Sequence, residues 1–153
     1  MNRMLTTVAA GALLAVALPA LAGGAPAIEF LNSGKVTPTT PPFSEAVRVG
    51  DTLYLSGQIG IKPGTLELAP GGIEAEARQT LENIRTTLET HGYTMRDVVK
   101  CTVMLADITE WAAFNAVYRS FFPPPYPARS ALGANGLAMG ARVEVECIAA
   151  RVG

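Results

Sequence analysis

The chain has 153 residues, enough for one domain with a hydrophobic core. Its 12 Lys and Arg residues nearly balance its 13 Asp and Glu residues, giving a formal net charge of −1. Nucleic-acid binders usually carry a basic excess that neutralises phosphates, so we expect no nucleic-acid partner. His91 is the only histidine and no C-x-x-C pair occurs, so we also predict no metal site.

The first 22 residues have the pattern of a secretory signal peptide. Arg3 lies in a short positive start, and residues 5–18 form an apolar run that is too short to span a bilayer. Ala20-Leu21-Ala22 supplies an A-x-A pattern, so we expect cleavage after Ala22 and a periplasmic or secreted protein without membrane attachment. The alternative is an uncleaved N-terminal anchor.

Residues 23–41 are rich in Gly, Pro, Ala and Thr and predict a flexible lead-in to a domain over 42–153. Alternating segments at 45–49 and 52–56, joined by Gly50-Asp51, predict a β-hairpin. After a glycine-rich loop, apolar residues at spacings of four, three and four predict a helix over 73–91.

A run rich in β-branched residues predicts a strand over 97–105, and a second helix should follow and end at the triproline 123–125. This helix carries an aromatic stripe that we interpret as core: Trp111, Phe114, Tyr118 and Phe121. Strands over 129–132 and 142–150 complete the order ββαβαββ.

This order predicts an α+β fold in which two helices pack on one face of a single sheet. The opposite face would then be left without a cover. A large exposed apolar sheet is unfavourable, so we expect other copies of the chain to cover it.

The two cysteines, Cys101 and Cys147, each fall inside a predicted strand. Export would permit a disulfide, provided that the two strands are neighbours and the side chains face each other. We favour the alternative, in which both are buried, unpaired and act as small apolar residues.

The C-terminal part of the chain places Arg129 ahead of a strand that carries Glu144 and Glu146. An arginine fork matches a carboxylate, and a carboxylate held on a strand is positioned to act as a base. Alternation puts both glutamates on the sheet face away from the helices. From this local pattern alone, solvated charges or a pairing with Arg142 are favoured over an active site.

Five sequence blocks occur together in a recognisable order. They are Pro42-Phe43-Ser44, Ser56-Gly57-Gln58-Ile59, Asn115-Ala116-Val117-Tyr118, Pro127-Ala128-Arg129-Ser130 and Val143-Glu144-Val145-Glu146-Cys147. With these blocks the chain resembles the RidA/YjgF family of enamine and imine deaminases, from about residue 42 to its C-terminus. The resemblance implies a chorismate-mutase-like fold and a homotrimer with its clefts between subunits.

The resemblance also implies roles for individual residues. Arg129 would bind the substrate carboxylate and Glu144 would activate the hydrolytic water, while Ser56 and Asn115 would line or support the cleft. The implied activity is hydrolysis of a 2-imino or enamine acid to a 2-oxo acid and ammonia, with no cofactor. The alternatives are a non-catalytic trimeric protein that binds small carboxylates and, disfavoured by the acidic charge balance, a ribonuclease or translation inhibitor.

Three further residues would border the same cleft. Phe43 stands where relatives often have a tyrosine, and Ala131 stands where a cysteine commonly follows the arginine block. Tyr126 precedes that block. The first two departures leave Arg129 and Glu144 intact, so we expect them to affect substrate preference.

Overall fold

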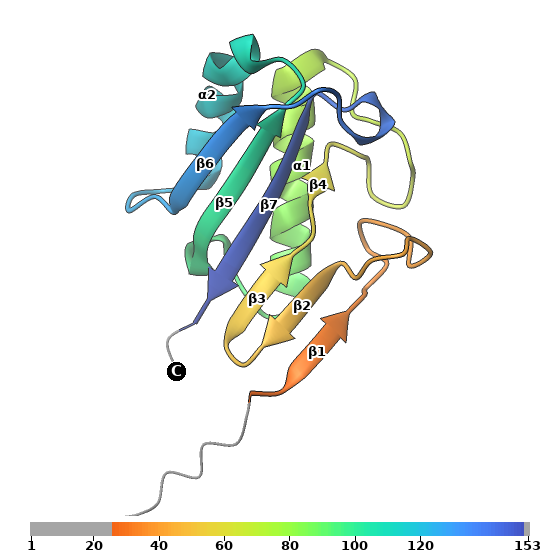
Figure 1. The fold of residues 1–153 in the computed structure, drawn as a ribbon, viewed down its shortest axis with the longest axis vertical. Helices are drawn as coiled ribbons and strands as arrows, with labels where there is room; N and C mark the ends of the chain where they lie inside the picture. Colours follow the sequence, from red (N-terminus) through yellow and green to blue (C-terminus); the bar gives the residue numbers. More distant parts are fainter. Residues whose placement is uncertain (1–25, 152–153) are drawn as a thin grey trace, which may run out of the picture.

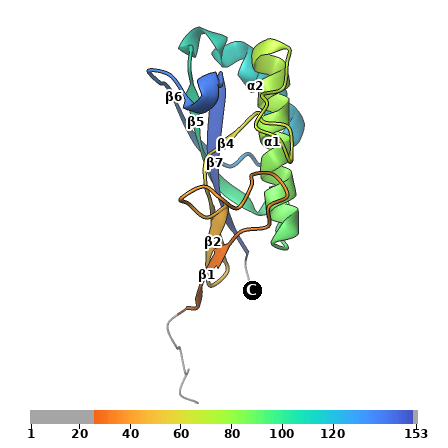
Figure 2. The same cartoon turned by 90° about the vertical axis from the view of Figure 1, so that its right-hand side faces the viewer.

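The structure is a computed structural model that describes residues 26–151. One sheet carries two helices on the same face, as Figure 1 and the edge-on view of Figure 2 show. The signal peptide predicted over residues 1–22 lies outside the described residues. Between residues 26 and 151, no helix is both long enough and apolar enough to cross a membrane.

The elements include seven strands, two α-helices and three short 3-10 turns. The strands are β1 (Ile28–Leu31), β2 (Ala46–Val49), β3 (Thr52–Leu55), β4 (Gln58–Ile59), β5 (Val98–Leu105), β6 (Ala128–Gly133) and β7 (Val143–Ala150). The helices are α1 (Gly72–Thr90) and α2 (Trp111–Phe121). The 3-10 turns are η1 (Met95–Asp97), η2 (Ile108–Glu110) and η3 (Ala138–Gly140).

The sheet order is β1-β2-β3-β7-β5-β6, and β4 also pairs with β7. The pair β5–β6 is parallel because α2 crosses over between the two strands, and the other pairs are antiparallel. The C-terminal strand β7 therefore lies inside the sheet, whereas β6 is an edge strand. This confirms the predicted α+β fold and adds two strands, β1 and β4, to the expected order.

The core lies between the helices and the sheet. Leu81, Ile84 and Leu88 on α1 are fully buried, as are Val143 and Val145 on β7. Removing each of these side chains from water contributes roughly 1.5–3 kcal/mol to folding. The stripe predicted for the first helix is therefore confirmed, and it packs α1 against β7.

The described part of the predicted flexible lead-in is not structureless, which corrects the expectation for residues 23–41. Residues Ile28–Leu31 form β1 against β2, and Val36 is fully buried. Ser33 donates backbone and side-chain hydrogen bonds to the carboxylate of Glu45 at 2.7–3.2 Å. The Gly-, Pro- and Thr-rich composition indicated a loop, but the free edge of β2 offered hydrogen-bonding groups that a pairing strand satisfies.

The favoured expectation of two unpaired cysteines is wrong, because Cys101 and Cys147 form a disulfide. The two residues stand directly opposite each other on the antiparallel strands β5 and β7, and their Cα atoms are 4.1 Å apart. Both side chains point to the buried helix side. Strand order could not be read from the local sequence pattern, and it is the adjacency of β5 and β7 that makes the bond possible.

The sheet face away from the helices carries a row of apolar side chains. The strand register aligns Phe30, Val47, Tyr54 and Ile148 across four strands. Phe30 is 73% exposed and Tyr54 is 46% exposed, and Figure 2 shows both helices on the other side of the sheet. The described part of the chain therefore leaves an apolar sheet face open, as the sequence predicted.

Candidate functional site

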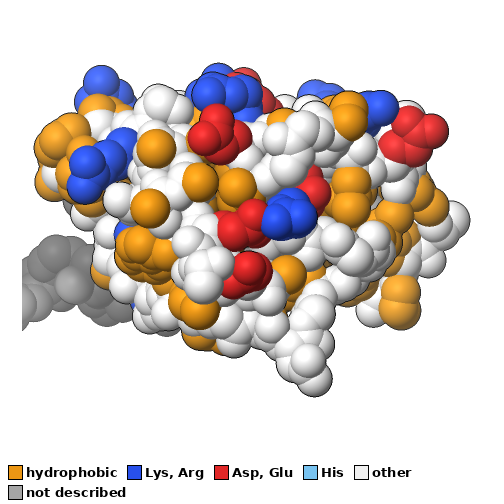
Figure 3. Space-filling view, turned by 90° about the horizontal axis from the view of Figure 1, so that it is seen from above, with side chains coloured by type: hydrophobic (Ala, Val, Ile, Leu, Met, Phe, Trp, Pro, Cys, Tyr) orange, Lys and Arg blue, Asp and Glu red, His pale blue; other side chains and the backbone are white. Residues whose placement is uncertain are grey.

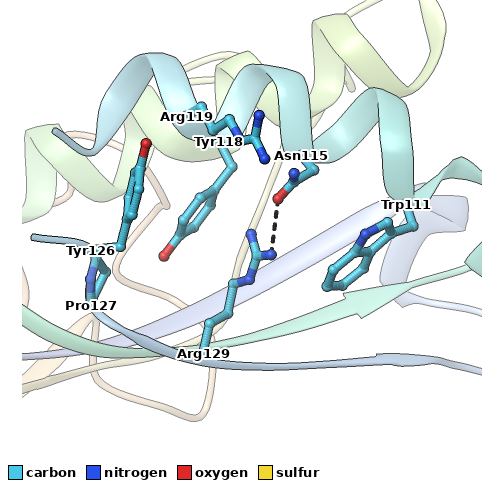
Figure 4. A pocket seen from close by; sticks show the side chains of 7 residues that line it. All are labelled: Trp111, Asn115, Tyr118, Arg119, Tyr126, Pro127 and Arg129. Carbon is cyan, nitrogen blue, oxygen red and sulfur yellow. Dashed lines mark hydrogen bonds between the residues drawn. The ribbon is translucent and has the colours of Figure 1, made fainter. Parts of the chain in front are cut away.

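Arg129 lies on the edge strand β6, beneath helix α2. The parallel register sets it beside Cys101, whose side chain is buried on the helix side. Side chains of adjacent paired residues in a sheet share a face, so Arg129 also projects toward the helices. Figure 4 shows its side chain rising from β6 toward residues of α2.

The guanidinium of Arg129 is held by three side chains of α2. Its Nη2 donates a hydrogen bond of 2.9 Å to Oδ1 of Asn115. Its Cζ lies 4.7 Å from the ring centroid of Trp111 and 4.4 Å from that of Tyr118, within the range of cation–π attraction. The buried Nη1 has no hydrogen-bond partner among residues 26–151. The group is thus oriented, yet part of its donor capacity is unused.

A cavity of about 360 Å³ opens beside this guanidinium (Figure 4). The lining side chains come from α2 and from the segment leading into β6: Trp111, Asn115, Tyr118, Arg119, Tyr126, Pro127 and Arg129. We call this the arginine cavity. Two of its lining residues are cationic and none is acidic, so the cavity suits an anion.

Tyr118 keeps the inner wall of the arginine cavity neutral. Burial raises the pKa of its phenol to about 12, although the nearby charge of Arg129 acts in the opposite direction. The hydroxyl therefore stays protonated at neutral pH, and the positive charge of Arg129 is not cancelled by a phenolate. No hydrogen-bond partner of this hydroxyl occurs among the described residues.

Trp111 corrects the interpretation of the aromatic stripe as core. Phe114, Tyr118 and Phe121 are buried as predicted, but Trp111 is 38% exposed and lines the arginine cavity. It begins a second stripe that continues through Asn115 and Arg119 at spacings of four, which places the three on one helix face. That spacing was visible in the sequence, but only the position of α2 over the edge strand shows that this face borders a cavity.

Glu144 lies on β7 and faces the opposite side of the sheet. It alternates with the buried Val143 and Val145, as predicted, and is itself half-buried. Burial, and next the charge of Glu146, raise the pKa of the Glu144 carboxyl above its ordinary value. A carboxylate in such a setting is a stronger base than an exposed one.

The position of the Glu144 carboxylate depends on Gly57, which follows β3. A Cβ atom at Gly57 would lie 2.0 Å from Oε1 of Glu144, so only glycine leaves the carboxylate in place. Ser56 is fixed nearby because its hydroxyl donates a 2.6 Å hydrogen bond to the carbonyl of Ser44. Phe43 precedes Ser44 and is 54% exposed. We call Ser56, Gly57 and Glu144 the glutamate cluster.

The structure therefore divides the predicted site residues into two groups. Arg129, Asn115 and Tyr126 meet in the arginine cavity, and Ala131 lies two residues from Arg129 on the same face, packed against the core. The glutamate cluster is on the other face of the sheet, and β5 separates β6 from β7. A single chain does not bring Arg129 and Glu144 together. Among residues 26–151, no group of three or more His, Cys, Asp or Glu side chains could hold a metal ion.

Comparison with known proteins places these features in context. Residues 35–151 match the family described as Endoribonuclease L-PSP. A goat (Capra hircus) protein named 2-iminobutanoate/2-iminopropanoate deaminase is 42% identical over 120 residues, which are 78% of this chain and 88% of that protein.

Solved structures show the same fold. RidA from an Antarctic Psychrobacter is 38% identical with a TM-score of 0.76, and the match covers 80% of this chain and 99% of that one. E. coli TdcF, solved with bound serine, is 30% identical with a TM-score of 0.76, and the match covers 81% of this chain and 99% of that one.

Proposed function

Because the chain belongs to the Endoribonuclease L-PSP family, also called RidA/YjgF, we propose that it hydrolyses 2-imino acids to 2-oxo acids and ammonia. Curated relatives about 40% identical over most of the chain are named as imine deaminases. The observation that supports the proposal for this chain is a pair of groups, which we call the half-sites. One is the guanidinium of Arg129, oriented so that it can bind a carboxylate, and the other is the half-buried carboxylate of Glu144, which can act as a base.

The two half-sites would meet between subunits of a homotrimer. Arg129 and Glu144 face opposite sides of the sheet, so a complete site needs a second copy of the chain. The open apolar face with Phe30 and Tyr54 gives those copies a surface to bury. In this arrangement the arginine cavity of one copy would lie against the glutamate cluster of its neighbour.

The reaction needs only these groups and one water molecule. The guanidinium of Arg129 would donate to the substrate carboxylate, while the rings of Trp111 and Tyr118 keep it in place. Glu144 of the adjacent copy would accept a proton from water as its oxygen bonds to the imine carbon and the C=N π electrons move to nitrogen. Glu144 then delivers this proton to the nitrogen, which gives a tetrahedral amino alcohol. The hydroxyl of that adduct gives its own proton to Glu144, which passes it to the amino nitrogen as the C–N bond breaks, so that ammonia leaves and a C=O bond remains.

Export of the mature protein is part of the proposal. The predicted signal peptide over residues 1–22 would direct the chain to the periplasm or the medium. The disulfide between Cys101 and Cys147 supports an oxidising compartment, because such bonds are rare in the reducing cytosol. Fractionation of expressing cells, followed by mass determination of the mature chain, tests both the location and the cleavage after Ala22.

The word endoribonuclease in the family description raises RNA cleavage as a second activity. The sequence carries a slight acidic excess, which does not favour phosphate binding. On the end of the molecule shown in Figure 3, acidic, basic and apolar side chains are interspersed and do not form a continuous basic surface. These charges favour a small-molecule substrate over RNA.

The decisive experiment measures ammonia release from freshly generated imines of several amino acids. The mature protein should accelerate release, and both Glu144→Gln and Arg129→Met should abolish the acceleration. A protein that binds 2-oxo acids without hydrolysing imines would instead be a carboxylate-binding protein, and the deaminase proposal would be wrong.

Mixing the two inactive variants tests the inter-subunit site. After random reassembly, about a quarter of the sites should combine an intact Arg129 with an intact Glu144 from a neighbour, restoring a similar fraction of activity. Complete inactivity of a verified mixed trimer would show that both residues must come from one copy.

A further inference from the structure

The arginine cavity contains a second guanidinium that binding of one carboxylate does not use. Arg119 lies one turn beyond Asn115 on α2 and lines the same cavity as Arg129. Figure 4 shows Arg119 and Asn115 projecting from successive turns of the helix on the side of the cavity. Asn115 accepts a hydrogen bond from Arg129, and Arg119 lines the same cavity as this bonded pair.

Arg119 also has no acidic partner in the described part of the chain. The ion pairs found there involve Arg48, Lys62, Arg85, His91 and Arg142, and none includes Arg119. The lining of the cavity contains no Asp or Glu that could neutralise it. Within one copy these two cations are not compensated, and beside the single Glu144 carboxylate that a neighbour would bring they still leave a net positive charge, which favours a ligand with two negative charges.

We infer that the arginine cavity is selective for acids with a second carboxylate, so that the preferred substrates are 2-imino dicarboxylic acids. This inference rests on the proposed function. Arg129 would hold the carboxylate beside the imine, and Arg119 at the rim would hold the carboxylate at the far end of the substrate. The cavity volume of about 360 Å³ accommodates a short dicarboxylic acid with water.

The aromatic residues determine which part of the ligand each arginine can reach. Trp111 and Tyr118 enclose the guanidinium of Arg129, whereas Arg119 is exposed. The inner carboxylate is therefore held in a less hydrated setting, and the outer one in a more hydrated setting. Arg119 should consequently discriminate between substrates without being required for binding itself, because an exposed ion pair contributes much less than an enclosed one.

The fluorescence of Trp111 can be used to measure ligand binding in the arginine cavity. Trp111 is the only tryptophan in the chain, and its ring stacks on Arg129. Ligand entry should change its fluorescence. The stable 2-oxo acids that hydrolysis would produce can therefore be titrated without any imine: 2-oxobutanoate as the monocarboxylate and 2-oxoglutarate as the dicarboxylate. Isothermal titration calorimetry gives the same Kd values independently of fluorescence.

The expected result is that 2-oxoglutarate binds about fivefold more tightly than 2-oxobutanoate, and that Arg119→Gln removes this preference. Arg78→Gln is the matched control, because Arg78 is an exposed arginine on α1 outside the cavity, and its loss should keep the preference. Equal affinities in the wild type, no binding of either acid, or a preference that survives Arg119→Gln would each overturn the inference.

Imine hydrolysis supplies the second measurement. The ratio of kcat/KM for the imine of glutamate over the imine of alanine should exceed one and fall about fivefold in Arg119→Gln. Hydrolysis of both imines with a ratio that does not respond to Arg119→Gln overturns the dicarboxylate inference but leaves the deaminase proposal standing. Selective 2-oxo acid binding with no hydrolysis of any imine would overturn the deaminase proposal but leave the dicarboxylate selectivity of the cavity standing.

Discussion

Reduction of the disulfide between Cys101 and Cys147 should strongly destabilise the protein. The bond closes a loop with a sequence separation of 46 residues. In the chain-entropy description of cross-links, a loop of this size restricts the unfolded chain by about 4 kcal/mol at 25 °C. For a domain of this length, we expect the melting temperature to fall by about 10 °C or more.

The measurement is guanidinium-induced unfolding of exported wild-type protein with and without a reductant that is present throughout unfolding and refolding. Reduction should lower the free energy of unfolding and raise the m-value, because an unlinked unfolded chain exposes more surface. Reduced wild type is a better comparison than a Cys→Ala variant, since both side chains are buried and truncation would add a cavity. A Cys101→Ala/Cys147→Ala variant that does not respond to reductant serves as the control.

Two results would refute this reasoning. Titration of the denatured, unreduced protein could find both cysteines as free thiols, which would mean that the bond does not form in the compartment where the protein resides. Alternatively, oxidised and reduced protein could unfold with the same free energy and m-value. The bond would then be present but would not restrict the unfolded chain.

Three further changes test the half-sites. Gly57→Ala should lower kcat by at least about tenfold with little loss of stability, because the new methyl displaces the flexible end of Glu144 and not backbone; unchanged kcat would refute it. Burial and Glu146 raise the pKa of the Glu144 carboxyl, so Glu146→Gln should move the acid limb of kcat/KM to lower pH, and an upward shift would contradict this. Asn115→Leu removes the amide that orients Arg129, so the factor by which KM rises should be about ten times the factor by which kcat falls. Equal changes in both constants would indicate a different role.

Much of the fold was predictable because periodicity reports directly on burial. The stripe through Leu81, Ile84 and Leu88 identified α1 within one residue at each end. The alternation along β7 correctly put Glu144 and Glu146 on the face away from the helices. By contrast, β1 was missed because a short edge strand is stabilised by pairing with β2, which its own composition does not reveal.

The sequence drew attention to individual residues but not to their arrangement. The sequence blocks singled out Arg129, Asn115 and Glu144, whose roles stay predictions, and Trp111 was interpreted as core because aromatic spacing on a helix usually indicates burial. Strand order decided which of these residues border a cavity. It placed β6 at the sheet edge, where the N-terminal turn of α2 leaves Trp111 partly exposed above a cavity.

The sequence by itself determined which residues are apolar, how they repeat and which short blocks they form, and these local properties fix helices, strands and family membership. Only the tertiary structure decided that Cys101 meets Cys147 and that Arg129 and Glu144 occupy opposite faces of one sheet. Both facts depend on which strands become neighbours. Strand pairing joins residues far apart in the chain, so no local pattern encodes it.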